Sequence, residues 1–331
     1  MKQAPVSATL TTGVASAALV LLLAGCGAED TAAAPADGGG GGTRTVSHLY
    51  GDTEIPAEPR SVVSVSVTST PLLLSLDVPV VASGVTGTSA LTDDKGFFAQ
   101  WAETADERGV EPLPGPEVSL EAVASAAPDL IVGNGFGADA VSEEVYEQLS
   151  EIAPTVVHGE SDMAWLDTTD QYAATFERQD RAEEITAEYE ALVEETAARL
   201  DTEHDVVVLT GTPNGFNVFT EESAQGRLVT DLGLAVHALP DDVGAPSGQG
   251  GERSDIVELS SERASDFGDA TLLFVNTQGQ EIEDYLEVSP TLESVPAWED
   301  DRVFTLGAAS FRMDYYSVPV VAERLTEVIG S

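Results

Sequence analysis

The chain has 331 residues, 42% of them hydrophobic, and a formal net charge of −44 at pH 7, because 58 acidic residues stand against 14 basic ones. This length is enough for two ordinary domains, since one hydrophobic core commonly serves about 100 to 200 residues. The negative charge excludes nucleic acid as an expected partner, because phosphate binding requires a basic surface. We interpret the acidity as favouring solubility.

The first 25 residues have the features of an export signal. Lys2 precedes a short apolar run, and the small residues Ala24 and Gly25 stand before Cys26, the only cysteine in the chain. The run is too short to be a stable membrane span. The tetrapeptide LAGC resembles a bacterial lipobox, in which Cys26 is lipid-modified and begins the mature protein; the alternative is an ordinary signal peptide. We predict a lipoprotein signal over residues 1–25 and an extracytoplasmic protein anchored to the cell membrane.

Two α/β lobes are expected after a flexible tether. Residues 26–44 are rich in glycine, alanine and aspartate and cannot form a core. β-Branched runs then alternate with amphipathic segments over residues 45–170, and the same alternation returns over 201–331. Such alternation predicts right-handed crossovers and a sheet covered on both faces, so each part is expected to be a Rossmann-like lobe.

A long helix is expected between the lobes, over residues 171–200. Apolar residues keep largely to helical spacing, no Gly or Pro interrupts, and Glu177 with Arg181 and Glu195 with Arg199 lie four residues apart. A helix of this size would extend roughly 40 Å or more. Two lobes joined by one long helix predict a ligand cleft between them.

Sequence motifs of common catalytic sites are missing. The chain has no GxSxG elbow, no Walker loop and no HExxH motif, and its four histidines are scattered without metal-ligand spacing. We therefore expect no catalytic residues and no direct protein ligands to a metal. An exported α/β enzyme remains the alternative from another class.

Several phrases of this sequence, in order, resemble the iron-siderophore and cobalamin class of ABC transporter substrate-binding proteins: IPAEPRSVVSV, VSLEAVASAAPDLIVGN, YEQLSEIAPTVV, the long helix, VTDLGL and SPTLESVPAWEDDRVFTLG. The resemblance runs from about Glu54 to the C-terminus. It implies a monomer with two α/β lobes bridged by one helix, which captures a ferric siderophore and delivers it to an ABC permease for iron uptake. Cobalamin and haem remain alternative ligands, and no resident cofactor is implied.

The resemblance also implies one permease-docking carboxylate on each lobe. The motif positions carry over to Glu121 in SLEAVASAAPDLIV and to Glu262 in SSERASDFGDATLLFV, with Glu258 as a rival to the second. Both glutamates stand two residues after a serine near an expected helix start, where backbone amides stabilise a carboxylate. The alternative is that each is only a first-turn helix acid.

Ligand contacts are expected in the loops after the strands, because the carboxyl ends of parallel strands line the crevice of such folds. Arg253 and Arg312 are the preferred pair, since basic residues are scarce and arginine donates several hydrogen bonds to chelating oxygens. The other candidates are Trp101, Asn134, Phe136, Trp165, Phe216, Asn217, Asn276 and Phe311. The acidic surface favours a neutral hydroxamate complex over a triply negative catecholate. For haem, Tyr315 or Tyr316 would be the axial ligand.

Overall fold

The computed structural model of the protein describes residues 42–159, 164–201, 203–240, 245–246 and 254–330. The predicted signal, Cys26 and most of the tether lie outside the described residues, as does Arg253. Among the helices that are described, none is long and apolar enough to cross a membrane. The folded part begins with β1, close to the predicted end of the tether.

The N-terminal lobe is built on a five-stranded sheet of order β5-β4-β3-β6-β7, in which all neighbouring strands are parallel. A separate antiparallel hairpin, β1 with β2, precedes it. The elements of this lobe are β1 (Thr43–His48), β2 (Gly51–Pro56), β3 (Val62–Ser64), α1 (Ser69–Ser75), β4 (Val80–Ser83), α2 (Ala99–Glu107), β5 (Glu111–Pro112), α3 (Leu120–Ser125), β6 (Leu130–Asn134), α4 (Glu143–Ser150) and β7 (Thr155–His158).

The C-terminal lobe has a mixed six-stranded sheet of order β10-β11-β9-β8-β12-β13. Its strands β8, β12 and β13 are parallel, as the alternation predicted, whereas β9, β11 and β10 are antiparallel additions. The elements are β8 (Val206–Thr212), β9 (Gly215–Phe219), α7 (Ala224–Asp231), β10 (Ala245–Pro246), β11 (Ile256–Ser260), the 3-10 helix η1 (Ser261–Phe267), β12 (Thr271–Phe274), α8 (Ile282–Val288), η2 (Pro290–Ser294), α9 (Pro296–Glu299), β13 (Val303–Thr305), η3 (Ala308–Ser310) and α10 (Ser317–Ile329).

Both sheets are covered on two faces, and the strand pattern shows why. Val206 and Val208 of β8 belong to one buried cluster, whereas Val207 and Leu209 belong to another. Successive side chains of a strand point to opposite faces, so a continuous run of buried β-branched and aliphatic residues is the pattern of a strand between two layers. This is the pattern on which the α/β fold was predicted.

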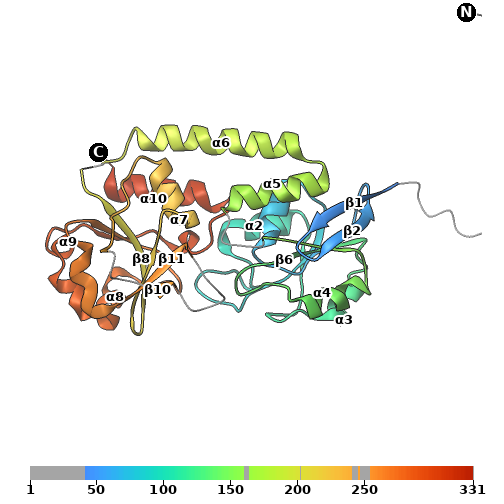
Figure 1. Ribbon diagram of the computed structural model, residues 1–331, viewed down its shortest axis with the longest axis horizontal. Coiled ribbons are helices and arrows are strands. Elements are labelled where there is room, and N and C mark those ends of the chain that lie inside the picture. Colours follow the sequence, from blue (N-terminus) through green and yellow to red (C-terminus); the bar gives the residue numbers. More distant parts are fainter. Residues whose placement is uncertain (1–41, 160–163, 202, 241–244, 247–253, 331) are drawn as a thin grey trace, which may run out of the picture. The chain divides into compact units, whose positions relative to one another are not determined.

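The connector differs from the single helix predicted over residues 171–200. Residues 171–176 end α5 (Trp165–Phe176), and a second helix, α6 (Gln179–Ala197), follows after a break. Glu177 adopts a left-handed conformation with φ of 53°, and the backbone amide of Arg178 bonds the carbonyl of Ala173 over 2.9 Å. Figure 1 shows α6 running beside α10 and turning into α5 at its other end. The connecting helix is therefore α6, about 28 Å long at 1.5 Å per residue.

Glycine at the break should stabilise the protein. A non-glycine residue in the left-handed region costs about 1 kcal/mol, so Glu177→Gly is expected to raise the free energy of unfolding by roughly that amount in urea titrations. Glu190→Gly, at an exposed position inside α6, should lower it by about 1 kcal/mol. Glu177→Ala, which removes the same carboxylate but keeps Cβ, should give no such gain. Equal destabilisation by both glycine variants would contradict the account of the break.

Candidate functional site

The turn between β3 and α1 presents polar groups at the carboxyl end of a central strand. The Ser66 hydroxyl donates to the Asp139 carboxylate, which also accepts from the backbone amide of Thr68 over 3.1 Å. The Thr68 Oγ1 is buried and has no hydrogen-bond partner within the part of the chain that the structure describes. A buried hydroxyl in that state is rare in folded proteins and indicates a place where a ligand or a water completes the bonding.

The end of β6 and the loop after it hold two of the predicted residues. The Asn134 amide donates to the carbonyl of Phe136 and, over 3.3 Å, to Asp139. Only 7% of Asn134 is exposed, so in this structure its amide holds the loop in shape. Phe136 is half-buried. Whether either contacts a ligand stays a prediction.

The segment Ser310–Asp314 lies where the two lobes meet, and a glutamine from each lobe holds it. From α7 of the C-terminal lobe, the Gln225 amide donates to the carbonyls of Ser310 (2.9 Å) and Phe311 (3.3 Å). From α2 of the N-terminal lobe, the Gln100 amide donates to the Asp314 carboxylate over 3.1 Å and to the carbonyl of Arg312 over 3.4 Å. The segment is thereby fixed at both ends.

The side chains that this segment presents are Phe311 and Arg312, two of the predicted ligand residues. The Phe311 ring lies 6.2 Å from the Phe98 ring of the N-terminal lobe, measured between centroids. The guanidinium carbon of Arg312 lies 5.0 Å from the Phe311 ring centroid. Both residues are half-buried. An arginine stacked on an aromatic ring between two lobes can bond chelating oxygens while the ring covers apolar parts of a ligand.

Asp314 is a buried carboxylate beneath this segment, with 2% of its surface exposed. It accepts hydrogen bonds from the backbone amides of Tyr316 and Ser317, 2.9 Å each, as well as from Gln100. Burial raises the pKa of Asp314 to about 6, against the opposing effect of these hydrogen bonds. One hydrogen bond between the lobes therefore ends on a carboxylate whose pKa is raised by burial.

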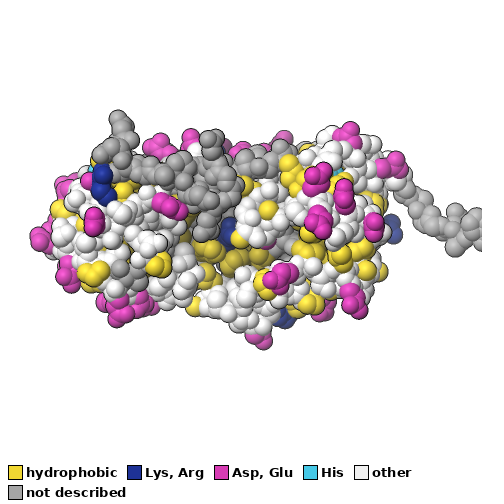
Figure 2. Space-filling view, turned by 60° about the horizontal axis from the view of Figure 1, so that its bottom comes forward, with side chains coloured by type: hydrophobic (Ala, Val, Ile, Leu, Met, Phe, Trp, Pro, Cys, Tyr) yellow, Lys and Arg dark blue, Asp and Glu magenta, His cyan; other side chains and the backbone are white. Residues whose placement is uncertain are grey.

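Figure 2 shows the surface between the two lobes, with the C-terminal part on the left and the N-terminal part on the right. The surface is hollowed near its middle, with hydrophobic side chains on the floor and a basic side chain beside them. Acidic side chains are spread over the outer surface of both parts. The hollow therefore differs from its surroundings in both polarity and charge.

Two predicted ligand residues belong instead to the hydrophobic core. Trp101 has 0% of its surface exposed and packs against Phe97, with ring centroids 4.9 Å apart. Phe216 is 1% exposed and packs against Phe267 at 5.2 Å. Fully covered rings have no surface for a ligand, so both predictions are wrong for this structure. Phe216 was expected in a loop, but β8 turns directly into β9 and places it inside the sheet.

Three other predicted residues occupy structured positions. One of them, Asn276, adjoins the Ser310–Asp314 segment, because its backbone amide donates to the Ser310 hydroxyl over 3.1 Å. Asn217 is half-buried in β9, paired with Thr210 and Glu258 rather than lying in a loop. Asn276 follows β12, is 4% exposed, and its amide donates to the carbonyl of Gln280 over 2.9 Å. Trp165 begins α5 and packs edge-on against Tyr189 of α6, with ring centroids 5.9 Å apart.

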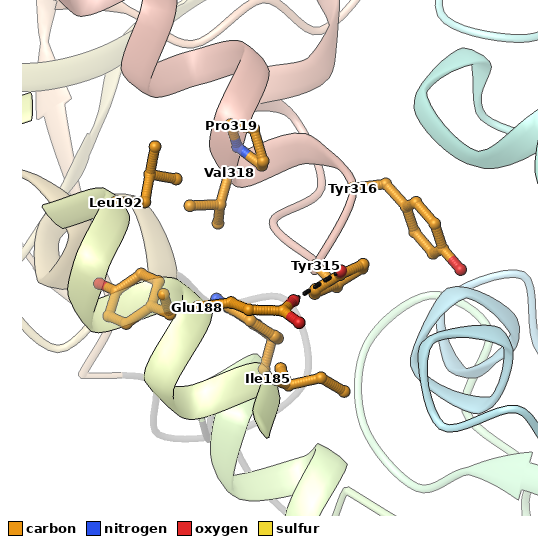
Figure 3. Close-up of a pocket in the computed structure, with 9 residues that line it drawn as sticks. Ile185, Glu188, Leu192, Tyr315, Tyr316, Val318 and Pro319 are labelled. Atoms are coloured by element: carbon orange, nitrogen blue, oxygen red, sulfur yellow. Dashed lines mark hydrogen bonds between the residues drawn. The ribbon is translucent and has the colours of Figure 1, made fainter. Parts of the chain in front are cut away.

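Of the two tyrosines considered for a haem, Tyr315 lies against α6, whereas the Tyr316 ring points away from it, toward Thr104 of α2 (Figure 3). The Tyr315 hydroxyl donates to the Glu188 carboxylate over 2.7 Å and accepts from Arg181 over 3.2 Å. Burial is the main cause that raises the pKa of Tyr315, and it raises that of Tyr316 to about 12. Both remain phenols at neutral pH, and a role as axial ligand stays a prediction.

The two predicted docking glutamates hold matching places in the two lobes. Glu121 is the second residue of α3, after Ser119, whose hydroxyl accepts from the backbone amide of Ala122. Glu262 is the second residue of η1, after Ser260. Both are exposed. The rival Glu258 is exposed too, but it lies within β11 opposite Asn217 and does not begin a helix.

Five residues of the site were missed by sequence reasoning: Ser66, Asp139, Gln100, Gln225 and Asp314. Ser66 and Asp139 come shortly after strands, which is a signal that could have found them. The two glutamines lie on helices and belong to no motif. Among the described residues, no group of three or more His, Cys, Asp or Glu side chains could hold a metal ion.

Comparisons with known proteins agree with this architecture. Residues 62–309 match the family described as periplasmic binding protein. The chain is 34% identical over 286 residues to the ferric enterobactin-binding periplasmic protein FepB of Escherichia coli O6:H1, covering 85% of this chain and 89% of that one. It is 28% identical over 224 residues to the probable siderophore-binding lipoprotein YfiY of Bacillus subtilis, covering 65% and 64%. The crystal structure of holo-ViuP matches with a TM-score of 0.74 and 28% identity, covering 87% and 95%.

The raised pKa of Asp314 predicts a pH effect on stability. Because the folded state holds this proton more tightly than the unfolded chain, the contribution of Asp314 to stability falls as pH rises from about 4 to about 6. Asp314→Asn lacks the titration, so its free energy of unfolding should rise relative to the wild type across that window, by up to ~3 kcal/mol. Urea unfolding at several pH values measures this.

The matched control is Asp94→Asn, which removes an exposed carboxylate. Its stability should run parallel to the wild type between pH 4 and 6. The same slope in both variants would contradict the assignment of the effect to Asp314.

Proposed function

The chain belongs to the periplasmic binding protein family, and on this premise we propose that it captures a ferric siderophore outside the cytoplasm and delivers it to an ABC permease. The family is a class of substrate-binding proteins rather than enzymes. The observation that carries the ligand proposal is the Phe311–Arg312 pair, held between the lobes by Gln100 and Gln225. Support also comes from the relatives, one named for ferric enterobactin binding and one for siderophore binding.

The described residues suggest how such a ligand is held. Arg312 would donate to the chelating oxygens of the complex, and the Phe311 ring would cover its organic part. On the N-terminal side, Thr68 supplies a buried hydroxyl that lacks a partner among the described residues. Because Gln100 ties the Ser310–Asp314 segment to the N-terminal lobe, the position of Arg312 depends on how the lobes meet. Closure and ligand contact are thereby coupled.

Two observations point to different ferric siderophores as the ligand. The acidic surface would admit a neutral ferric hydroxamate more easily than a highly charged complex. The relative at 34% identity is named for ferric enterobactin. Both complexes are therefore needed as test ligands.

Removal of the Arg312 charge should weaken capture. Arg312→Met keeps an unbranched apolar stem but loses the donors, and loss of a hydrogen bond involving a charged group costs about 1.5 to 3 kcal/mol, or roughly 10- to 150-fold in affinity. Fluorescence titration with ferric enterobactin and with a ferric hydroxamate measures it.

Arg302→Met is the control, because Arg302 pairs with Asp269 just before β13, at the amino end of the strand. Its affinity should equal that of the wild type. If Arg312→Met bound both complexes as tightly as Arg302→Met does, the proposed ligand contact would be wrong.

We also propose that Glu121 and Glu262 dock on arginines of the permease, one for each lobe. The proposal is supported by their matching places at the second position of exposed helix starts after a serine. Glu121 also borders a surface pocket of about 500 Å³ with Pro112, Pro114 and Ser125, which could receive a protruding side chain. Lipidation of Cys26 would keep the protein near its transporter, and the relative named as a lipoprotein supports this.

Charge reversal at both positions should separate delivery from capture. The double variant Glu121→Arg, Glu262→Arg is expected to abolish iron-siderophore uptake by cells, because like charges would repel at both contacts, while ligand affinity stays unchanged. Glu144→Arg is the matched control, since Glu144 is exposed at the second position of α4 after a serine cap. Normal uptake with the double variant would remove the docking role.

A further inference from the structure

A second cavity lies away from the strand ends, where α5, α6 and α10 meet. Its volume is about 390 Å³, within the range of small-molecule pockets. Aromatic side chains of Trp165, Tyr189 and Tyr315 line it together with the aliphatic Leu192 and Val318. Figure 3 shows Glu188 of α6 reaching toward Tyr315, with Leu192 and Val318 on another side of the pocket. Neither Phe311 nor Arg312 is among its lining residues.

The charges at the edge of this cavity do not cancel. Arg181 donates to Glu184 (3.1 Å) and to Glu188 (3.0 Å), and it also donates to the Tyr315 hydroxyl and the carbonyl of Ser75. Two carboxylates against one guanidinium leave one net negative charge. Glu188 lines the cavity, whereas Arg181 and Glu184 do not. A molecule in the cavity would therefore meet a carboxylate rather than a cation.

Glu188 is able to accept more hydrogen bonds. One of its oxygens accepts from Arg181 and the other from Tyr315, and a carboxylate offers about four acceptor sites. These hydrogen bonds from Tyr315 and Arg181 lower the pKa of Glu188, so it is ionised at neutral pH. About half of its side chain is exposed, at 49%, which leaves it accessible.

The aromatic side chains that line the cavity also favour a positively charged ligand. Trp165 and Tyr189 form an edge-to-face pair, with an interplanar angle of 80°, and the Tyr315 ring already lies 5.5 Å from the guanidinium carbon of Arg181. The faces of tryptophan and tyrosine rings attract cations, and more strongly where water is displaced. An anion would find neither a cationic lining residue nor a favourable field on a chain of net charge −44.

We propose that this cavity is a second binding site, which takes a monovalent organic ammonium ion with an aromatic or branched aliphatic body. The ammonium group lies against Glu188, and the apolar body packs among Trp165, Tyr189, Leu192 and Val318. The site is separate from the proposed siderophore site and does not depend on it. Its occupant touches all three helices, so it holds α5, α6 and α10 together.

Isothermal titration calorimetry of the protein with benzyltrimethylammonium, at an ionic strength near 0.15 M, tests the proposal. Saturable binding at one site is expected, with a dissociation constant near or below ~1 mM. Benzyl alcohol and benzenesulfonate, which are neutral and anionic, should bind at least about fivefold more weakly. Glu188→Gln should weaken the cation by about fivefold or more, the size of one modest ion pair.

Two variants distinguish binding in the cavity from non-specific attraction of a cation to an acidic protein. Glu184→Gln removes a carboxylate that also bonds Arg181 but lies outside the cavity, and it should keep the wild-type affinity. Leu192→Trp keeps every charge and fills the cavity, so it should abolish binding. Thermal unfolding checks that each variant is folded. Equal binding to Leu192→Trp and the wild type, equal effects of the two glutamine variants, or no saturable binding would each overturn the proposal.

Discussion

The arrangement of the proposed ligand site depends on the Ser310–Asp314 segment, which both lobes hold through hydrogen bonds to glutamine amides. Gln225 fixes its beginning and Gln100 its end. The bond to Asp314 places a buried carboxylate at the contact between the lobes. Burying a charge without partners is costly, so the backbone amides of Tyr316 and Ser317 that also bond it are part of the same constraint. Phe311 and Arg312 project from a segment that neither lobe positions alone.

Charge distinguishes the two proposed binding sites. On a surface dominated by carboxylates, Arg312 would offer donors to the chelating oxygens of the proposed ligand. The cavity beside α6 has the opposite chemistry, with Glu188 among aromatic rings. The two places therefore favour ligands of different charge, although both lie where the lobes and their connector come together.

The sequence predicted the α/β alternation well, because strands buried on both faces leave continuous β-branched runs such as those of β3 and β8. It missed the break at Glu177, since no Gly or Pro marks it and tertiary structure holds that residue in the left-handed region. It also placed Trp101 and Phe216 at the ligand, because a sequence does not tell which face of a helix or strand a large ring occupies. Gln100 and Gln225 were not predicted, because glutamines on helices belong to no sequence motif. Arg312 was chosen because basic residues are scarce in the chain, and its contact with a ligand remains a prediction.

The central claim is that a ferric siderophore is the ligand, and direct titration of the mature protein tests it. The tryptophan fluorescence should be quenched saturably by at least one ferric siderophore complex, and haem and cobalamin should cause no saturable change. Quenching by haem or cobalamin alone, or by none of these molecules, would contradict the account.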